Sequence, residues 1–134
     1  MAGRRDGSAD AILVDAFVGA RVPQHLATLE ALHDLARVVT PAGAVAINVV
    51  DAGPSDDARS IAAGLGEAFR HVAALGAGPV LRGRRGGNIV LVAGHGELPL
   101  ERLRTRAAAD PSPAGMLTPD TMGIFCGGAV PWRD

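Results

Sequence analysis

The hydrophobic positions near the start of the chain predict two buried strands. Residues 12–14 form a short apolar run that ends at Asp15, and residues 44–50 form a second run that ends at Asp51. Continuous apolar runs of this length are typical of strands buried on both faces, as in parallel sheets. We therefore expect two such strands, each with an acid at its carboxyl end.

Helical spacing follows each of these runs. From Leu26 to Val39 apolar residues recur every three or four positions, which predicts an amphipathic helix. Pro23 suits its first turn, and residues 40–43 (TPAG) are expected to end it. A second helix is predicted by four apolar residues spaced four, four and three apart, namely Ile61, Leu65, Phe69 and Val72.

From residue 79 onward the hydrophobic pattern returns to the short period of strands. Residues 79–81 and 88–93 flank a glycine- and arginine-rich connection, so they are expected to pair as an antiparallel hairpin. Two short helices follow in the pattern. One begins near Pro99, and the other has Thr118 as N-cap and stops at residues 127–128.

The order of predicted elements is strand, helix, strand, helix, strand, strand, which indicates an α/β fold. Parallel strands closed by an antiparallel hairpin are typical of the last half of a class I methyltransferase sheet. We expect three segments: a polar N-terminal lead over residues 1–9, a partial Rossmann-like domain over residues 10–95, and a short-helix tail packing on it over residues 96–134.

Composition removes several classes of function. The net charge is −1, so no bulk basic field favours nucleic acid or a membrane surface. All 13 basic residues are arginine, which excludes a Walker, Schiff-base or catalytic lysine within this sequence. The single cysteine, Cys126, forbids an internal disulfide, and no run is long enough to span a bilayer. We expect a cytoplasmic protein.

Four segments in the same order carry a resemblance to a known family. They are residues 10–17 (DAILVDAF), 22–28 (VPQHLAT), 40–48 (TPAGAVAIN) and 87–91 (GNIVL). Together they resemble the spermidine synthases and their methyltransferase-like relatives, from the fourth strand to the last. The resemblance covers about residues 10 to 95, the C-terminal half of that fold.

The resemblance implies a transferase of polyamine biosynthesis, or a methyltransferase, using S-adenosylmethionine or its decarboxylated form. The residue matching the family's catalytic acid is Asp15, beside the donor's reactive end and a small amine acceptor. Such a carboxylate orients a cationic amine and accepts its proton as nitrogen attacks the carbon next to the sulfonium. The same resemblance assigns substrate or donor binding to Ala16, Phe17, His25 and Asn48.

Two departures from the family pattern bear on these expectations. Spermidine synthases carry a second acid three residues after the first, and that position is Val18 here. The glycine-rich donor loop and the acid that holds the ribose belong to the other half of the fold, and neither occurs in this sequence. We therefore expect an enzyme incomplete in this chain; the alternative is a non-catalytic remnant or interaction module.

The candidate residues also have ordinary structural interpretations. The carboxylate of Asp15 is catalytic, donor-orienting, or a loop acid that caps the backbone after its strand. For Asn48 and Asp51, turn chemistry leading into residues 53–54 is favoured over ligand binding. His25 and His33 stand eight apart, outside the spacing of a helical metal pair, so no metal site is expected. The arginines among residues 82–87 favour a solvated turn over an RNA contact.

The first predicted strand also carries an expectation about partners. Without a further strand beside residues 12–14, this apolar strand forms a sheet edge with unpaired backbone groups. Such an edge favours a homodimer, or a partner chain that pairs with it.

Overall fold

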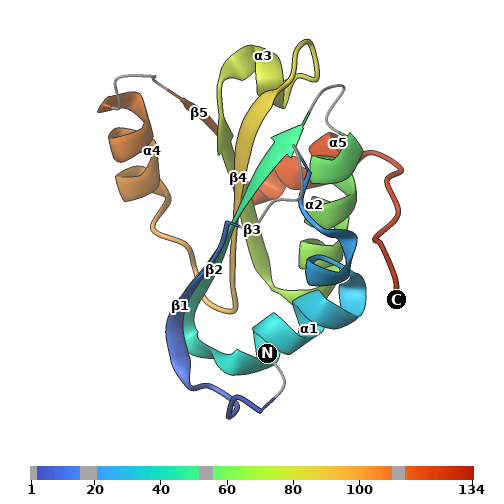
Figure 1. Ribbon diagram of the computed structural model, residues 1–134. Helices are drawn as coiled ribbons and strands as arrows, with labels where there is room; N and C mark the ends of the chain where they lie inside the picture. The colour runs from blue at the N-terminus through green and yellow to red at the C-terminus, as the bar shows by residue number, and fades with distance from the viewer. Residues whose placement is uncertain (1–2, 16–20, 52–55, 110–113) are drawn as a thin grey trace.

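The computed structural model describes residues 3–15, 21–51, 56–109 and 114–134, which fold around a mixed five-stranded sheet (Figure 1). Its strands are β1 (Ala9–Val14), β2 (Val39–Asp51), β3 (His71–Gly76), β4 (Gly87–Gly94) and β5 (Gly115–Leu117). They lie in the order β1-β2-β4-β3-β5. β1 is parallel to β2, whereas β4 is antiparallel to both β2 and β3. The α/β fold with a terminal antiparallel pair is confirmed.

Helices lie on both sides of this sheet. They are α1 (Leu29–Val38), α2 (Asp56–Ala68), α3 (Gly78–Leu81), α4 (Leu100–Ala109) and α5 (Met122–Cys126), with 3-10 turns η1 (Gln24–Leu26) and η2 (Pro119–Thr121). In Figure 1, α1, α2 and α5 lie on one side of the sheet and α4 lies on the other. α4 buries none of its residues. We call the sheet face opposite α1 and α2 the open face.

The register of the central strands places the core. Val45, Ile47 and Val49 of β2 are fully buried, and Ile89 and Leu91 of β4 join them in the same apolar cluster. Alternate residues of a strand point to opposite faces. The positions between them therefore lie on the open face, where they are only partly buried.

The first helix begins later than the spacing predicts. Residues 24–26 form the separate 3-10 turn η1, and α1 starts after Thr28, whose Oγ1 accepts a hydrogen bond from the N–H of Ala31 (3.2 Å). The N–H of Leu29 donates to the carbonyl oxygen of Trp132 at 2.7 Å. A first-turn N–H has no partner within its own helix, so the C-terminal tail supplies one here.

The predicted helix stop, residues 40–43, belongs to β2 instead. β2 pairs with β1 at Ala9↔Val39 and next at Ala11↔Ala44, so the intervening residues of β2 bulge out of the ladder. At Gly43 the backbone of β2 comes back into close contact with β1. A Cβ added there would lie 2.5 Å from the carbonyl oxygen of Asp10. Only glycine fits this approach.

The predicted hairpin is antiparallel, but its first strand was placed wrongly. Residues 71–76 form β3, so Val72 leaves the helical face to which its spacing assigned it. Residues 79–81 lie in α3, a single turn with Pro79 at its start. Pro79 has no N–H to donate to a ladder, and a run of three apolar residues is too short to show a period.

β1 differs from the strand that the sequence predicts. It lies at the end of the sheet, as expected, but it is not buried on both faces, because Leu13 is 70% exposed. Leu13 pairs in register with Ala46 and therefore lies on the open face. No element among the described residues covers its side chain there.

The two ends of the described chain pack on the helices. In the N-terminal lead, the N–H groups of Gly7 and Ser8 donate to the carbonyls of residues 37 and 38. Arg37 also bonds Asp6 and Asp34, and its hydrogen bonds hold the pKa of the Asp34 carboxyl below its ordinary value. In the C-terminal tail α5 follows Thr118 as predicted, whereas the short edge strand β5 was missed.

Two glycine replacements should move stability in opposite directions. Gly43→Ala should lower the free energy of unfolding by about 1–3 kcal/mol, because the new Cβ meets backbone that cannot move aside. Gly66→Ala in α2 is the matched control. Its Cβ would meet nothing within 4 Å, and helix propensity should raise stability by about 0.5–1 kcal/mol. Urea denaturation measures both, and equal effects would contradict the bulge.

Candidate functional site

Asp15 and Asn48 lie side by side at one edge of the sheet. The parallel register pairs Val14 of β1 with Ile47 of β2, so the residues that follow them, Asp15 and Asn48, lie opposite one another. There the Nδ2–H of Asn48 donates to Oδ1 of Asp15 at 3.1 Å. The structure thus brings together two residues that the sequence places 33 positions apart.

A hollow of about 610 Å³ begins at Asp15 and follows β1. One side is strand, and the other is the turn η1 together with α1. Its lining is mostly apolar and comprises Ile12, Leu13, Val14, Asp15, His25, Leu26, Ala31 and Leu35. We call it the β1 groove. Its size falls within the usual range for small-ligand sites, with Asp15 and His25 as its ionisable side chains.

The wall of the β1 groove is held in place from two sides. Before η1, Arg21 makes a two-pronged ion pair with Asp57 at the start of α2, with N···O distances of 2.9 and 2.8 Å. After η1, the tail bond from Leu29 to Trp132 fixes the first turn of α1. The turn that carries His25 is therefore tied to both α2 and the C-terminal tail.

The side chain of Asn48 bonds Asp15 through its amide nitrogen, but its amide oxygen has no partner among the described residues. Its Nδ2 is used by Asp15, while its Oδ1 is shielded from solvent and has no hydrogen-bond partner among the described residues. A shielded acceptor without a partner costs stability. Such atoms occur where a ligand or another group completes the bonding, which makes Asn48 a candidate binding residue.

The other predicted residues divide into those the structure places and those it does not. His25 lies on η1, exposed, and lines the β1 groove. Ala16 and Phe17 lie outside the described residues, as does Val18. Their predicted roles, like those of Asp15, His25 and Asn48 themselves, stay predictions.

The remaining histidines and the cysteine are spread over the fold. The Nε2–H of His95 donates to the carbonyl of Ala36 at 2.6 Å and joins the exit of β4 to α1. Burial raises the pKa of the Cys126 thiol, which disfavours a nucleophilic thiolate. Across residues 3–15, 21–51, 56–109 and 114–134, no group of three His, Cys, Asp or Glu side chains could hold a metal ion. Nor is any helix there long and apolar enough to cross a bilayer.

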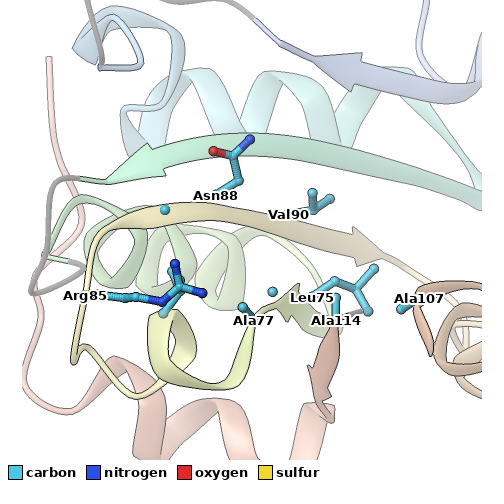
Figure 2. Close-up of a pocket in the computed structure, with 10 residues that line it drawn as sticks. Leu75, Ala77, Arg85, Asn88, Val90, Ala107 and Ala114 are labelled. Carbon is cyan, nitrogen blue, oxygen red and sulfur yellow. The ribbon is translucent and has the colours of Figure 1, made fainter. Parts of the chain in front are cut away.

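A second hollow, of about 670 Å³, lies over the open face (Figure 2). Its floor is formed by Leu75 and Val90, which pair across β3 and β4. Arg85 reaches in from the turn before β4, and Ala107 of α4 closes the far end. Both Arg85 and Asn88 are exposed, and the lining contains no acid. Sequence reasoning gave no signal for this hollow, because its residues come from four elements.

The β1 groove is therefore a better candidate for a catalytic site than the hollow over the open face. An acid at the carboxyl end of a parallel strand is where open α/β sheets bind their ligands. The Asp15 carboxylate has one oxygen bonded to Asn48, and its other oxygen has no partner among the described residues. Such a group can orient a cation or accept a proton. The fold is of the Rossmann-like α/β class, and Asp15 with the β1 groove is its candidate ligand site.

Comparison with known structures narrows that class. The chain is similar to the crystal structure of a probable spermidine synthase from Corynebacterium glutamicum ATCC 13032, at 30% identity and a TM-score of 0.89. The match covers 98% of this chain and 50% of that one, so the chain spans half the length of the solved protein. Its fold is one half of a spermidine synthase-like fold. No protein-family model and no curated protein sequence matches the chain.

Replacing Asn48 should separate a structural role from a binding role. Asn48→Leu loses one hydrogen bond to an exposed carboxylate but also removes a shielded acceptor without a partner. We expect the free energy of unfolding to change by less than about 1 kcal/mol, because these effects oppose each other. Urea denaturation measures the change. A loss above about 2 kcal/mol would mean that Asn48 is there for stability.

Proposed function

We propose that this chain is the acceptor-side part of a spermidine synthase-like transferase, which moves an aminopropyl or methyl group from an S-adenosylmethionine-type donor to a small amine. The observation that carries the proposal is the position of Asp15. It lies at the carboxyl end of β1, bonded to Asn48 and lining an apolar groove. The likeness to half of a probable spermidine synthase supports the same family of reactions.

In this proposal Asp15 acts on the amine. Its carboxylate orients the cationic nitrogen and takes up the proton that the nitrogen loses. As the new N–C bond forms, the C–S bond of the sulfonium breaks, and its electron pair stays on sulfur as a neutral thioether. Asn48 holds one carboxylate oxygen, so the other is left to face the substrate. The apolar wall of Leu26 and Leu35 suits a methylene chain.

The donor needs residues beyond this sequence. The chain contains no GxGxxG turn, which in Rossmann-like folds holds the nucleotide part of the donor. We propose that this element comes from polypeptide outside these 134 residues. Within this division of labour, Asp15 and His25 belong to the acceptor's side of the site.

A non-catalytic interaction module is the second candidate. The observation that favours it is the position of β1 at the end of the sheet formed by the described strands, where Leu13 is largely exposed. A chain whose role is to pair with another polypeptide needs the edge of β1 but does not need the carboxylate of Asp15. Replacement of Asp15 therefore distinguishes the two functions.

Amine binding should depend on Asp15, which follows β1, and not on Asp10, which lies within β1. We expect a linear diamine to shift the NMR signals of residues lining the β1 groove, and Asp15→Asn to weaken that binding at least tenfold, since a charge-assisted hydrogen bond is worth about 1.5–3 kcal/mol. Asp10→Asn is the control, an exposed acid on the same strand outside the groove. Equal affinity in both variants would contradict a substrate role for Asp15.

The identity of the bound donor distinguishes aminopropyl transfer from methyl transfer. Calorimetric titration with S-adenosylmethionine and with its decarboxylated form should give heat with one of them once the donor-binding polypeptide is present. Mass spectrometry of the amine then shows which group it gained, and Asp15→Asn should slow transfer by about 10²–10⁴-fold. Heat and transfer from this chain alone would refute the proposed division of the site.

A further inference from the structure

The second hollow, over the β3 and β4 side of the open face, has no part in the proposed transferase. We call it the open-face hollow. Its volume of about 670 Å³ lies within the usual range for small-ligand sites. All of its lining falls between residues 75 and 114, in α3, β3, β4, α4 and the residues directly beside them. The chain thus builds this hollow from its own elements.

Helix α4 adds an apolar surface at one end of the open-face hollow. Leu100, Leu103 and Ala107 are its partly buried residues, and their spacing of three and four places them on one helix face. Ala107 lines the hollow beside the floor formed by Leu75 and Val90 (Figure 2). Yet α4 buries none of its residues. An apolar molecule in the hollow would therefore remove apolar surface of both the sheet and the helix from water.

The charge at the other end of the open-face hollow is positive. Arg85 enters from the turn before β4, and its guanidinium has no hydrogen-bond or ion-pair partner among the described residues. The lining contains no acid that could neutralise it, and Asn88 adds a side-chain amide. A guanidinium matches a carboxylate through two parallel hydrogen bonds. The hollow therefore combines an apolar floor with a single cationic end.

Contacts within the chain hold both walls of the open-face hollow. The N–H of Ala114 donates to the carbonyl oxygen of Ala107 at 3.1 Å, which ties the end of α4 to the residue before β5. On the other side α3 packs closely on the start of β4. A Cβ added at Gly87 would lie 2.8 Å from Cγ2 of Val80. Walls held in this way lower the cost of ordering the site when a ligand binds.

From these observations we infer that the open-face hollow binds a small organic carboxylate with an apolar body, such as a medium-chain fatty acid. The carboxylate pairs with Arg85, and the hydrocarbon lies over Leu75 and Val90 toward Ala107. One guanidinium balances one carboxylate, whereas a phosphate monoester carries up to about two negative charges near neutral pH. The described lining also has no aromatic side chain on which a nucleobase could stack. Both observations favour a carboxylate over a nucleotide.

An NMR titration of the chain with octanoate tests this inference. We expect saturable shifts of the methyl signals of Leu75, Val80 and Val90. Octanamide, which has the same hydrocarbon and a neutral head, should bind at least about tenfold more weakly, because hydrogen bonds to charged groups are the stronger ones. Equal binding of the two, or no saturable shift with octanoate, would overturn the inference. Shifts confined to the β1 groove would also overturn it.

Two arginines of the same turn separate this site from a general attraction of anions to the surface. Arg85→Gln should weaken octanoate binding at least about tenfold. Arg84→Gln is the matched control, because it removes the same charge from an exposed residue that does not line the hollow. We expect it to change the affinity less than about twofold, since salt screens exposed charges. Equal losses in both variants would overturn the inference.

Filling the open-face hollow tests its apolar part. Ala107→Phe should remove the saturable shifts, because the ring would occupy the space for the hydrocarbon. Ala108→Phe is the control, an exposed neighbour on α4 outside the lining, and should leave octanoate binding unchanged. Octanoate binding that survives Ala107→Phe would overturn the inference.

Sedimentation of the ligand-free chain gives the remaining outcome. A dimer that Ala107→Phe dissociates and Ala108→Phe leaves intact would overturn the inference in favour of a second copy as the occupant. None of these measurements involves Asp15, an amine or a donor. Failure of the carboxylate site therefore leaves the proposed transferase standing, and failure of the transferase leaves the carboxylate site standing.

Discussion

The burial of three side chains on β2 determines where the candidate site lies. Val45, Ile47 and Val49 are fully enclosed beneath the helices, which fixes the register of β2. A slip of one residue would turn them outward and push Asn48 into the core. Because the register is fixed, Asn48 stays on the open face beside Asp15. The polar pair is thus positioned by apolar packing on the other side of the same strand.

The site is assembled from elements of unequal firmness. Its floor belongs to a sheet in which β2 has ladder partners on both sides. Its wall is a single 3-10 turn, held by the Arg21–Asp57 ion pair and by the tail bond at Leu29. In this pair the Arg21 side chain is 72% exposed and that of Asp57 17% exposed, and an ion pair whose cation stands in solvent contributes on the order of 1 kcal/mol or less. The wall is therefore held by fewer and weaker interactions than the floor.

Sequence patterns predicted the strands and helices that bury a regular face, and failed where geometry alone decides. The two runs that became β1 and β2 were found because uninterrupted β-branched and aliphatic residues have few other uses. Val72 was misplaced because three-residue spacing continues by chance from α2 into β3. The exposure of Leu13 could not be predicted, since it depends on whether another element covers the open face at β1.

The same holds for the candidate site and for the glycines. Asp15 was found from its place after a strand, but its bond to Asn48 depends on a register that no local pattern contains. Gly64 and Gly66 look alike in the sequence of α2. A Cβ on Gly64 would lie 2.7 Å from Leu32 of α1, whereas one on Gly66 would lie in open space. Only the packing of α2 on α1 distinguishes them.

The bond between Leu29 and Trp132 has a consequence for how the chain folds. It joins the start of α1 to the last residues of the sequence, so the loop it closes is nearly the whole chain. During synthesis α1, β1 and β2 leave the ribosome long before Trp132 does. The N–H of Leu29 must therefore bond to water until Trp132 has emerged, and the wall of the β1 groove acquires this support only after all five strands of the sheet have been synthesised.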